Sequence, residues 1–262
     1  MAASGHIGGS TATPALEARG LALSWDDMPV ARDVSLTVGA GEVVCLVGRS
    51  GCGKTTLFHA LAGLSTPDEG TVLLHGTDVT GRPGSVSYML QKDLLLPSQT
   101  VLDNVCLPLV LGGMGRREAH AKAEPLFERF GLAGCERQWP SQLSGGMRQR
   151  AALLRTYLMD NDMVLLDEPF SALDALTRGD MRAWFCGIVR DLGLSALVIT
   201  HDVDEAVSMA DRVYVMRGAP AQGEPSGLVG QVEVTCPVEK RDGFDLTLEY
   251  LECKRRVMAL LG

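Results

Sequence analysis

Three short runs of apolar residues stand out along the chain, and each is continuous rather than alternating. They are Val43–Val47, Met163–Leu166 and Ala196–Ile199. Such a run is typical of a strand that is buried on both faces of a mainly parallel sheet. The runs end abruptly in glycine or polar residues, at Gly48, at Asp167–Glu168 and at Thr200–His201. Because ligands of open α/β sheets bind beyond the carboxyl ends of the strands, this pattern predicts a functional site at that edge.

The other segments predict how the chain is organised around these strands. Residues 16–38 alternate in part and favour a small antiparallel sheet, whereas residues from about 96 to 160 are mostly helical in pattern and suggest an inserted subdomain. Residues 218–227 indicate a Gly/Pro loop, 232–235 a short strand and 244–261 a helix. We therefore predict an α/β fold with a flexible segment 1–14, a main domain 15–217 and a short C-terminal extension 218–262.

Composition and charge narrow the classes of function. The chain has 262 residues, of which 46% are hydrophobic and 21% charged, and this balance is typical of a globular protein. A formal net charge of -8 argues against a protein that coats nucleic acid. No apolar run has the length of a membrane span, so we expect a partner to supply any membrane function. The 7 cysteines have no paired C-x-x-C spacing, which favours reduced thiols over a disulfide framework or a zinc site.

The segment after the first apolar run has the pattern of a phosphate-binding loop. Gly48-Arg49-Ser50-Gly51-Cys52-Gly53-Lys54-Thr55 fits G-x-x-x-x-G-K-[ST], and Thr56 begins the helical pattern that follows. Glycines let backbone N–H groups turn toward an anion, and the positive end of the next helix favours its charge. We expect Lys54 to reach the terminal phosphates of a nucleotide and the Thr55 hydroxyl to bind Mg²⁺. This segment predicts a P-loop NTPase core.

A second candidate anion site lies at residues 143–149, Leu-Ser-Gly-Gly-Met-Arg-Gln. Ser144 is a favourable N-cap, and the residues after it have helical apolar spacing. Gly145 and Gly146 in a first turn would cost roughly 1 kcal/mol each relative to alanine, so another requirement should explain them.

In this segment the sequence resembles the ATP-binding-cassette (ABC) ATPase family, whose signature is L-S-G-G-Q; Met147 stands where the family usually has glutamine. The resemblance extends from about Ala15 to Met216. It implies that Asp167 holds Mg²⁺ through its water shell, that Thr55 and Gln91 also contact Mg²⁺, and that Glu168 positions and activates the attacking water. It also implies that Gln91 and His201 contact the reacting groups, that Asp174 belongs to a loop crossing a dimer interface, and that Trp25 stacks on adenine. A core aromatic at Trp25, a structural histidine and a solvated strand end remain alternatives.

The resemblance further implies the partners and the location of the protein. ATP would be sandwiched between two chains, with Ser144, Gly145, Gly146 and Met147 of one copy completing the site of the other. Residues 94–105 would receive a short helix of a membrane permease, and an extracytoplasmic substrate-binding protein would belong to the complex. Residues 87–97 are most similar to importers of nitrate, sulfonates, taurine and thiamine precursors. We expect a cytoplasmic protein, peripheral on the inner face of the cell membrane, with no nucleic-acid partner. A non-transport ABC ATPase and a nucleotide kinase are the competing hypotheses.

Overall fold

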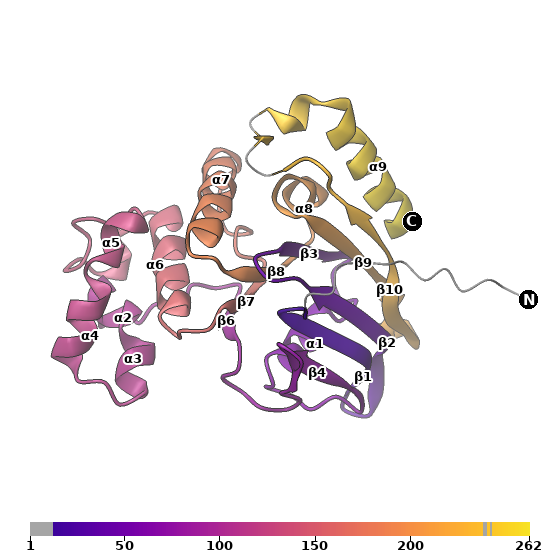
Figure 1. The fold of residues 1–262 in the computed structure, drawn as a ribbon, viewed down its shortest axis with the longest axis horizontal. Coiled ribbons are helices and arrows are strands. Elements are labelled where there is room, and N and C mark those ends of the chain that lie inside the picture. Colours follow the sequence, from indigo (N-terminus) through magenta and orange to yellow (C-terminus); the bar gives the residue numbers. More distant parts are fainter. Residues whose placement is uncertain (1–12, 238–239, 242) are drawn as a thin grey trace, which may run out of the picture.

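The computed structural model describes residues 13–237, 240–241 and 243–262 (Figure 1). Of the segment 1–14 predicted to be flexible, residues 1–12 lie outside the described residues. Within the described residues, one ten-stranded sheet has the order β5-β4-β1-β2-β10-β9-β3-β8-β7-β6. Its strands are β1 Leu16–Trp25, β2 Met28–Val38, β3 Val43–Gly48, β4 Glu69–Leu74, β5 Thr77–Asp78, β6 Ser87–Met89, β7 Met163–Asp167, β8 Ser195–Thr200, β9 Arg212–Ala219 and β10 Glu224–Glu233.

Helices flank this sheet and form a separate group at one end of the molecule (Figure 1). The α-helices are α1 Lys54–Leu61, α2 Val101–Val105, α3 Leu107–Leu111, α4 Arg116–Ala123, α5 Leu126–Arg129, α6 Gly145–Tyr157, α7 Ala175–Asp191, α8 Val203–Met209 and α9 Leu248–Leu261. Short 3-10 turns are η1 Pro140–Gln142, η2 Pro220–Gln222 and η4 Phe244–Leu246. Helices α2 to α6 gather beyond β6, at the end of the molecule away from β1 and β2. This group falls within the predicted helical insertion.

The three predicted strands are confirmed as β3, β7 and β8, which pair in parallel in the order β3-β8-β7 toward the β6 end of the sheet. All six residues of β3 are buried, and its side chains alternate between two cores. Val43 and Val47 pack into the core that contains α6, α7, α8 and α9, whereas Val44 and Leu46 pack against α1 and the N-terminal strands. Burial on both faces explains why the run is continuous in the sequence.

The predicted antiparallel sheet is also confirmed, because β1 pairs antiparallel with both β2 and β4. The turn between β1 and β2 pairs Trp25 with Met28, and Asp26 and Asp27 have positive φ angles of 48° and 62°. Short polar side chains tolerate this left-handed conformation, which favours a tight hairpin. The hairpin places Trp25 at its tip.

The predicted bounds in the C-terminal extension need correction. The expected loop 218–227 is a tight turn, since β9 continues to Ala219 and β10 begins at Glu224, with these two residues paired. Gly223 closes the turn with φ 82°, so glycine and proline here shape a hairpin rather than a long loop. Of the expected strand 232–235, only residues 232–233 are strand, and they are the end of β10. The expected helix 244–261 begins only at Leu248, because the Thr247 hydroxyl caps it by accepting the Tyr250 N–H at 3.2 Å. None of the described helices has the length and apolar character that crossing a membrane requires.

Candidate functional site

The phosphate-loop sequence connects β3 to α1, as its pattern predicts. Gly53 precedes the helix with φ 90°, a conformation that glycine adopts without strain. A side chain at Gly48 would place its Cβ 2.6 Å from the carbonyl oxygen of Met216, so glycine is required there for close packing. No side chain caps the N-terminus of α1, and the N–H groups of its first turn therefore face the loop. This is the geometry of an anion cradle.

Lys54 places its charge inside this loop. The side chain is buried, and its Nζ donates to the carbonyl oxygens of Gly48 at 2.8 Å and Arg49 at 3.1 Å. Cys52 is buried in the same loop, and this burial raises the pKa of its thiol. A protonated thiol is a poor nucleophile, so Cys52 packs within the loop rather than contributing chemistry.

Oxygen ligands suited to a magnesium ion meet where β7 ends beside the loop. The Thr55 hydroxyl donates to Asp167 Oδ2 at 3.2 Å, and the Tyr88 hydroxyl lies 3.4 Å from the same oxygen. Asp167 is largely buried, and burial raises the pKa of its carboxyl group. No group of three or more His, Cys, Asp or Glu side chains among the described residues forms a protein cage for a metal. A few oxygen ligands without a cage fit Mg²⁺, which takes its remaining ligands from phosphates and water.

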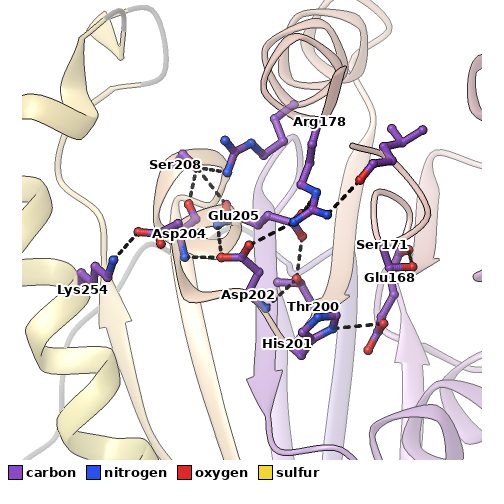
Figure 2. Close-up of polar contacts among 12 residues, drawn as sticks. Glu168, Ser171, Arg178, Thr200, His201, Asp202, Asp204, Glu205, Ser208 and Lys254 are labelled. Atoms are coloured by element: carbon purple, nitrogen blue, oxygen red, sulfur yellow. Dashed lines mark hydrogen bonds and ion pairs between the residues drawn. The ribbon is translucent and has the colours of Figure 1, made fainter. Parts of the chain in front are cut away.

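Glu168 is the centre of a second cluster at the same edge (Figure 2). Its Oε2 lies 3.1 Å from His201 Nδ1 and accepts a hydrogen bond from Gln91 Nε2 at 3.2 Å. Glu168 has φ 44°, a conformation that costs a non-glycine residue on the order of 1–3 kcal/mol. Three hydrogen bonds hold this backbone: Glu168 N–H donates to the Ile199 carbonyl at 3.0 Å, and the Glu168 carbonyl accepts the Ser171 hydroxyl at 3.0 Å and the Ser171 N–H at 3.2 Å. The fold therefore fixes where this carboxylate points.

An open cleft of about 410 Å³ joins the loop to the tip of the β1–β2 hairpin. Trp25 lines it and is 59% exposed, so this aromatic side chain is not part of the core. The cleft is lined by Trp25, Met28, Val30, Ser50, Gly51, Gly53, Lys54, Thr55, Thr56, Glu168, Pro220 and Ala221. The structure thus brings Trp25, the phosphate loop and Glu168 to one cleft.

Several residues around the site are missed by sequence reasoning. Tyr88 and Ser171 lie within segments that the resemblance identifies, but a single sequence gives neither side chain a partner. Pro220 and Ala221 reach the cleft only because β10 pairs with β2 at Ser226 and Ala31, a long-range contact that no local pattern indicates.

The signature segment does not reach this cleft, since none of the residues that line it comes from α6. Ser144 caps α6 as predicted, its hydroxyl accepting the Met147 N–H at 3.2 Å. A Cβ on Gly145 would lie 3.2 Å from Leu173 Cδ2, and one on Gly146 would lie 3.2 Å from Thr177 Cγ2. The two glycines therefore allow α6 to pack closely against the start of α7. Asp174 caps α7 by accepting the Thr177 N–H at 3.1 Å, and α7 lies beside α6 (Figure 1).

A phosphate loop between a buried parallel strand and a helix, facing paired acids at the end of another parallel strand of the same sheet, defines a P-loop nucleoside triphosphatase. A sequence profile of the family described as ABC transporter matches residues 31–171. The chain belongs to the ABC transporter family, and it is an ATP-binding, ATP-hydrolysing subunit of that family.

Relatives of this chain include ATP-binding subunits of import systems. The chain is 40% identical over 227 residues to the formylaminopyrimidine import ATP-binding protein ThiZ of Halalkalibacterium halodurans, covering 87% of this chain and 86% of ThiZ. It is 41% identical over 239 residues to the aliphatic sulfonates import ATP-binding protein SsuB 2 of Burkholderia lata, covering 91% and 85%. The solved structure of cbiO1 from Clostridium perfringens has the same fold, with a TM-score of 0.76 at 20% identity over 94% of this chain and 99% of cbiO1. The predicted α/β P-loop fold and the predicted importer branch are confirmed.

Proposed function

We propose that this ATPase drives the import of a small polar solute through a separate membrane permease. The relatives support this proposal, because their names assign them to import systems for small polar solutes. The solutes in those names differ from each other. The relatives therefore share the import of a small solute, and they do not indicate one particular compound. In an import complex of this kind the chain would lie against the inner face of the membrane. An extracytoplasmic binding protein would deliver the solute.

One observation carries the assigned chemistry: the Glu168 carboxylate faces the phosphate-loop cleft while His201 and Gln91 fix one of its oxygens. In the proposed reaction Glu168 accepts a proton from water as the water oxygen bonds to the γ-phosphorus. The bond from that phosphorus to the β–γ bridging oxygen breaks, which releases ADP and inorganic phosphate. Lys54 stabilises negative charge on the phosphate oxygens. Mg²⁺ held by Thr55, Asp167 and Gln91 would neutralise phosphate charge when bound.

The proposed nucleotide site is completed by a second copy of the chain. Within one chain, α6 begins away from the cleft, yet its capped N-terminus is a second anion-binding end. Ser144, Gly145, Gly146 and Met147 of one copy would contact ATP held by the other, with Asp174 at the interface. ATP would then hold the two copies together, and its hydrolysis would allow them to separate.

The surface proposed for the permease lies on the segment between β6 and α2 and on α3. Exposed leucines gather in these segments, at Leu90, Leu94, Leu96 and Leu111. Asn104 fixes the segment by accepting the Leu96 N–H at 2.6 Å and donating to the Leu96 carbonyl at 3.0 Å. Arg148 of α6 adds an ion pair to Asp93 at 3.2 Å. A rigid apolar surface that begins beside Gln91 suits transmission of movement from the nucleotide site to a partner.

The catalytic assignment is tested by Glu168→Gln, with Glu118→Gln on the exposed surface of α4 as the matched control. We expect Glu168→Gln to bind ATP, to lose hydrolysis and to elute as an ATP-dependent dimer in size-exclusion chromatography, and Glu118→Gln to behave as wild type. An active, monomeric Glu168→Gln variant would contradict the role of Glu168.

Composite sites are tested by mixing two inactive variants, Lys54→Ala and Ser144→Arg. A mixed dimer contains one site with both Lys54 and Ser144 intact, so random pairing in an equal mixture restores roughly a quarter of the sites. We expect hydrolysis to return on mixing. If the mixture is as inactive as its components, each chain hydrolyses ATP without the partner's signature segment.

A further inference from the structure

Arg178, in the first turn of α7, joins two loops of the nucleotide site (Figure 2). The first loop is Ser171–Asp174, which follows Glu168, and the second is Thr200–Asp202, which contains His201. Arg178 Nη2 donates to the carbonyl oxygen of Leu173 at 2.9 Å. On the other side, its Nη1 lies 3.6 Å from Asp202 Oδ2. One guanidinium group therefore contacts both loops.

A buried carboxylate strengthens the second contact. Arg178 Nε lies 3.6 Å from Glu205 Oε1, and the Glu205 side chain is only 4% exposed. Glu205 Oε2 accepts a hydrogen bond from the Thr200 hydroxyl at 2.6 Å, and Thr200 is also buried. A buried carboxylate requires a compensating charge, and Arg178 supplies one at ion-pair distance. Arg178 is thus linked through Glu205 to the residue that immediately precedes His201.

The far side of each loop contacts a functional element. His201 Nδ1 lies 3.1 Å from the Glu168 carboxylate, so the second loop reaches the proposed base. The Leu173 side chain packs over Gly145 at the start of α6, so the first loop reaches the signature segment. Asp202 fixes the second loop further by accepting the Asp204 N–H at 2.8 Å. Arg178 therefore connects, through these two loops, the start of α6 with the Glu168–His201 pair.

We propose that Arg178 is a positioning residue that couples the signature side of the molecule to His201 and Glu168. The proposal rests on the proposed function, because that function gives His201 and the loop Ser171–Asp174 their roles in ATP hydrolysis. A displacement of α6 and the first loop by the partner chain would pull on Arg178, and through Asp202 and Glu205 it would move His201. The proton-accepting site would then reach its working geometry only when the partner is in place.

The chemistry of arginine suits this task better than that of lysine. The planar guanidinium presents donors in several directions at once, so one group can contact a carbonyl and two carboxylates. A lysine would supply the same charge as a single point and could not make all three contacts. The simpler alternative is that Arg178 only neutralises the buried Glu205, which would be a contribution to stability and not to turnover.

Full-chain variants measured for ATP affinity, kcat and Tm distinguish a coupling role of Arg178 from simple neutralisation of Glu205. Arg178→Met removes the coupling, and the double variant Arg178→Met/Glu205→Gln also removes the uncompensated charge while keeping an acceptor for Thr200. Arg182→Met is the matched control, because Arg182 lies one turn further along α7 and hydrogen-bonds to Ser208 at 3.4 Å. Arg178→Lys tests whether charge alone is sufficient.

We expect Arg178→Met to keep ATP affinity near wild type and to lower kcat by roughly 10- to 100-fold, the effect of a misplaced catalytic group. The double variant should regain Tm but not kcat, and Arg178→Lys should regain Tm with only part of the kcat. Wild-type kcat in Arg178→Met would overturn the proposal. Full recovery of kcat in the double variant, or equal losses in Arg182→Met, would show a purely structural role.

Failure of the coupling role of Arg178 can be distinguished from failure of the proposed function. If Glu168→Gln hydrolyses ATP at the wild-type rate, the assignment of the base is wrong whatever Arg178 does. If Glu168→Gln is inactive and Arg178→Met is fully active, the catalytic assignment stands and the coupling role of Arg178 is refuted.

Discussion

Replacement of Trp25 by alanine separates recognition of the nucleobase from recognition of the phosphates. Trp25 lines the cleft with 59% of its surface exposed, so its removal leaves no cavity in the core. We expect the free energy of unfolding to change by no more than about 0.5 kcal/mol, as for other exposed positions. Stacking of a base on an aromatic ring contributes about 1–3 kcal/mol. At 1.4 kcal/mol for each factor of ten, ATP affinity should fall roughly 5- to 150-fold.

Isothermal titration calorimetry with ATP and with inorganic tripolyphosphate measures this difference. Tripolyphosphate has no base, so its affinity for Trp25→Ala should equal its affinity for the wild type. Trp139→Ala is the matched control, because Trp139 is also exposed, at 45%, and lies before η1 outside the cleft. Unchanged ATP affinity in Trp25→Ala, or an equal loss for both ligands, would refute base stacking at this position.

Three further outcomes follow from the same contacts. Ala221→Trp should weaken ATP binding without affecting tripolyphosphate in calorimetry, whereas Gln222→Trp, one residue further in η2 and outside the cleft lining, should change neither. Asp167→Asn should raise the Mg²⁺ concentration needed for half-maximal ATPase activity by at least about tenfold, the usual effect of losing a ligand interaction; an unchanged Mg²⁺ dependence would exclude Asp167 as a ligand. Leu94→Glu should bind ATP normally and lose co-purification with membrane proteins from detergent-solubilised membranes, whereas Leu64→Glu, equally exposed after α1, should retain it.

The parts of the fold that local chemistry determines were predictable from the sequence. The β3, β7 and β8 runs are apolar throughout because both faces of these strands are buried, and a parallel arrangement of strands requires this. The caps at Ser144 and Asp174 depend only on residues three positions further along the chain. The bounds at the C-terminal end were wrong because pairing between β9 and β10, and not the local Gly/Pro content, decides where the strands begin and end.

The candidate site was predictable where a short sequence motif determines the local backbone conformation. Lys54 and Thr55 lie in a loop whose shape its glycines largely determine, and Asp167 and Glu168 lie at a strand end. By contrast, the contact of Tyr88 with Asp167 depends on the pairing of β6 with β7, two strands that are separated by the whole helical insertion. The ion pair of Arg178 with Glu205 depends on how α7 packs beside α8. A single sequence contains no pattern for contacts of this kind.

The arrangement of the nucleotide site explains why ATP hydrolysis should depend on pairing with a second copy of the chain. The strand ends of β3, β7 and β8 place Lys54, Asp167 and His201 at one edge of the sheet. The signature segment lies away from this edge, because it begins α6 of the inserted helical group. It contacts the loop that follows Glu168 through Leu173. We expect ATP binding to use the phosphate-loop edge, and turnover to require in addition the signature segment of a second copy. A permease or partner chain that moves α6 would then control when the bound ATP is hydrolysed.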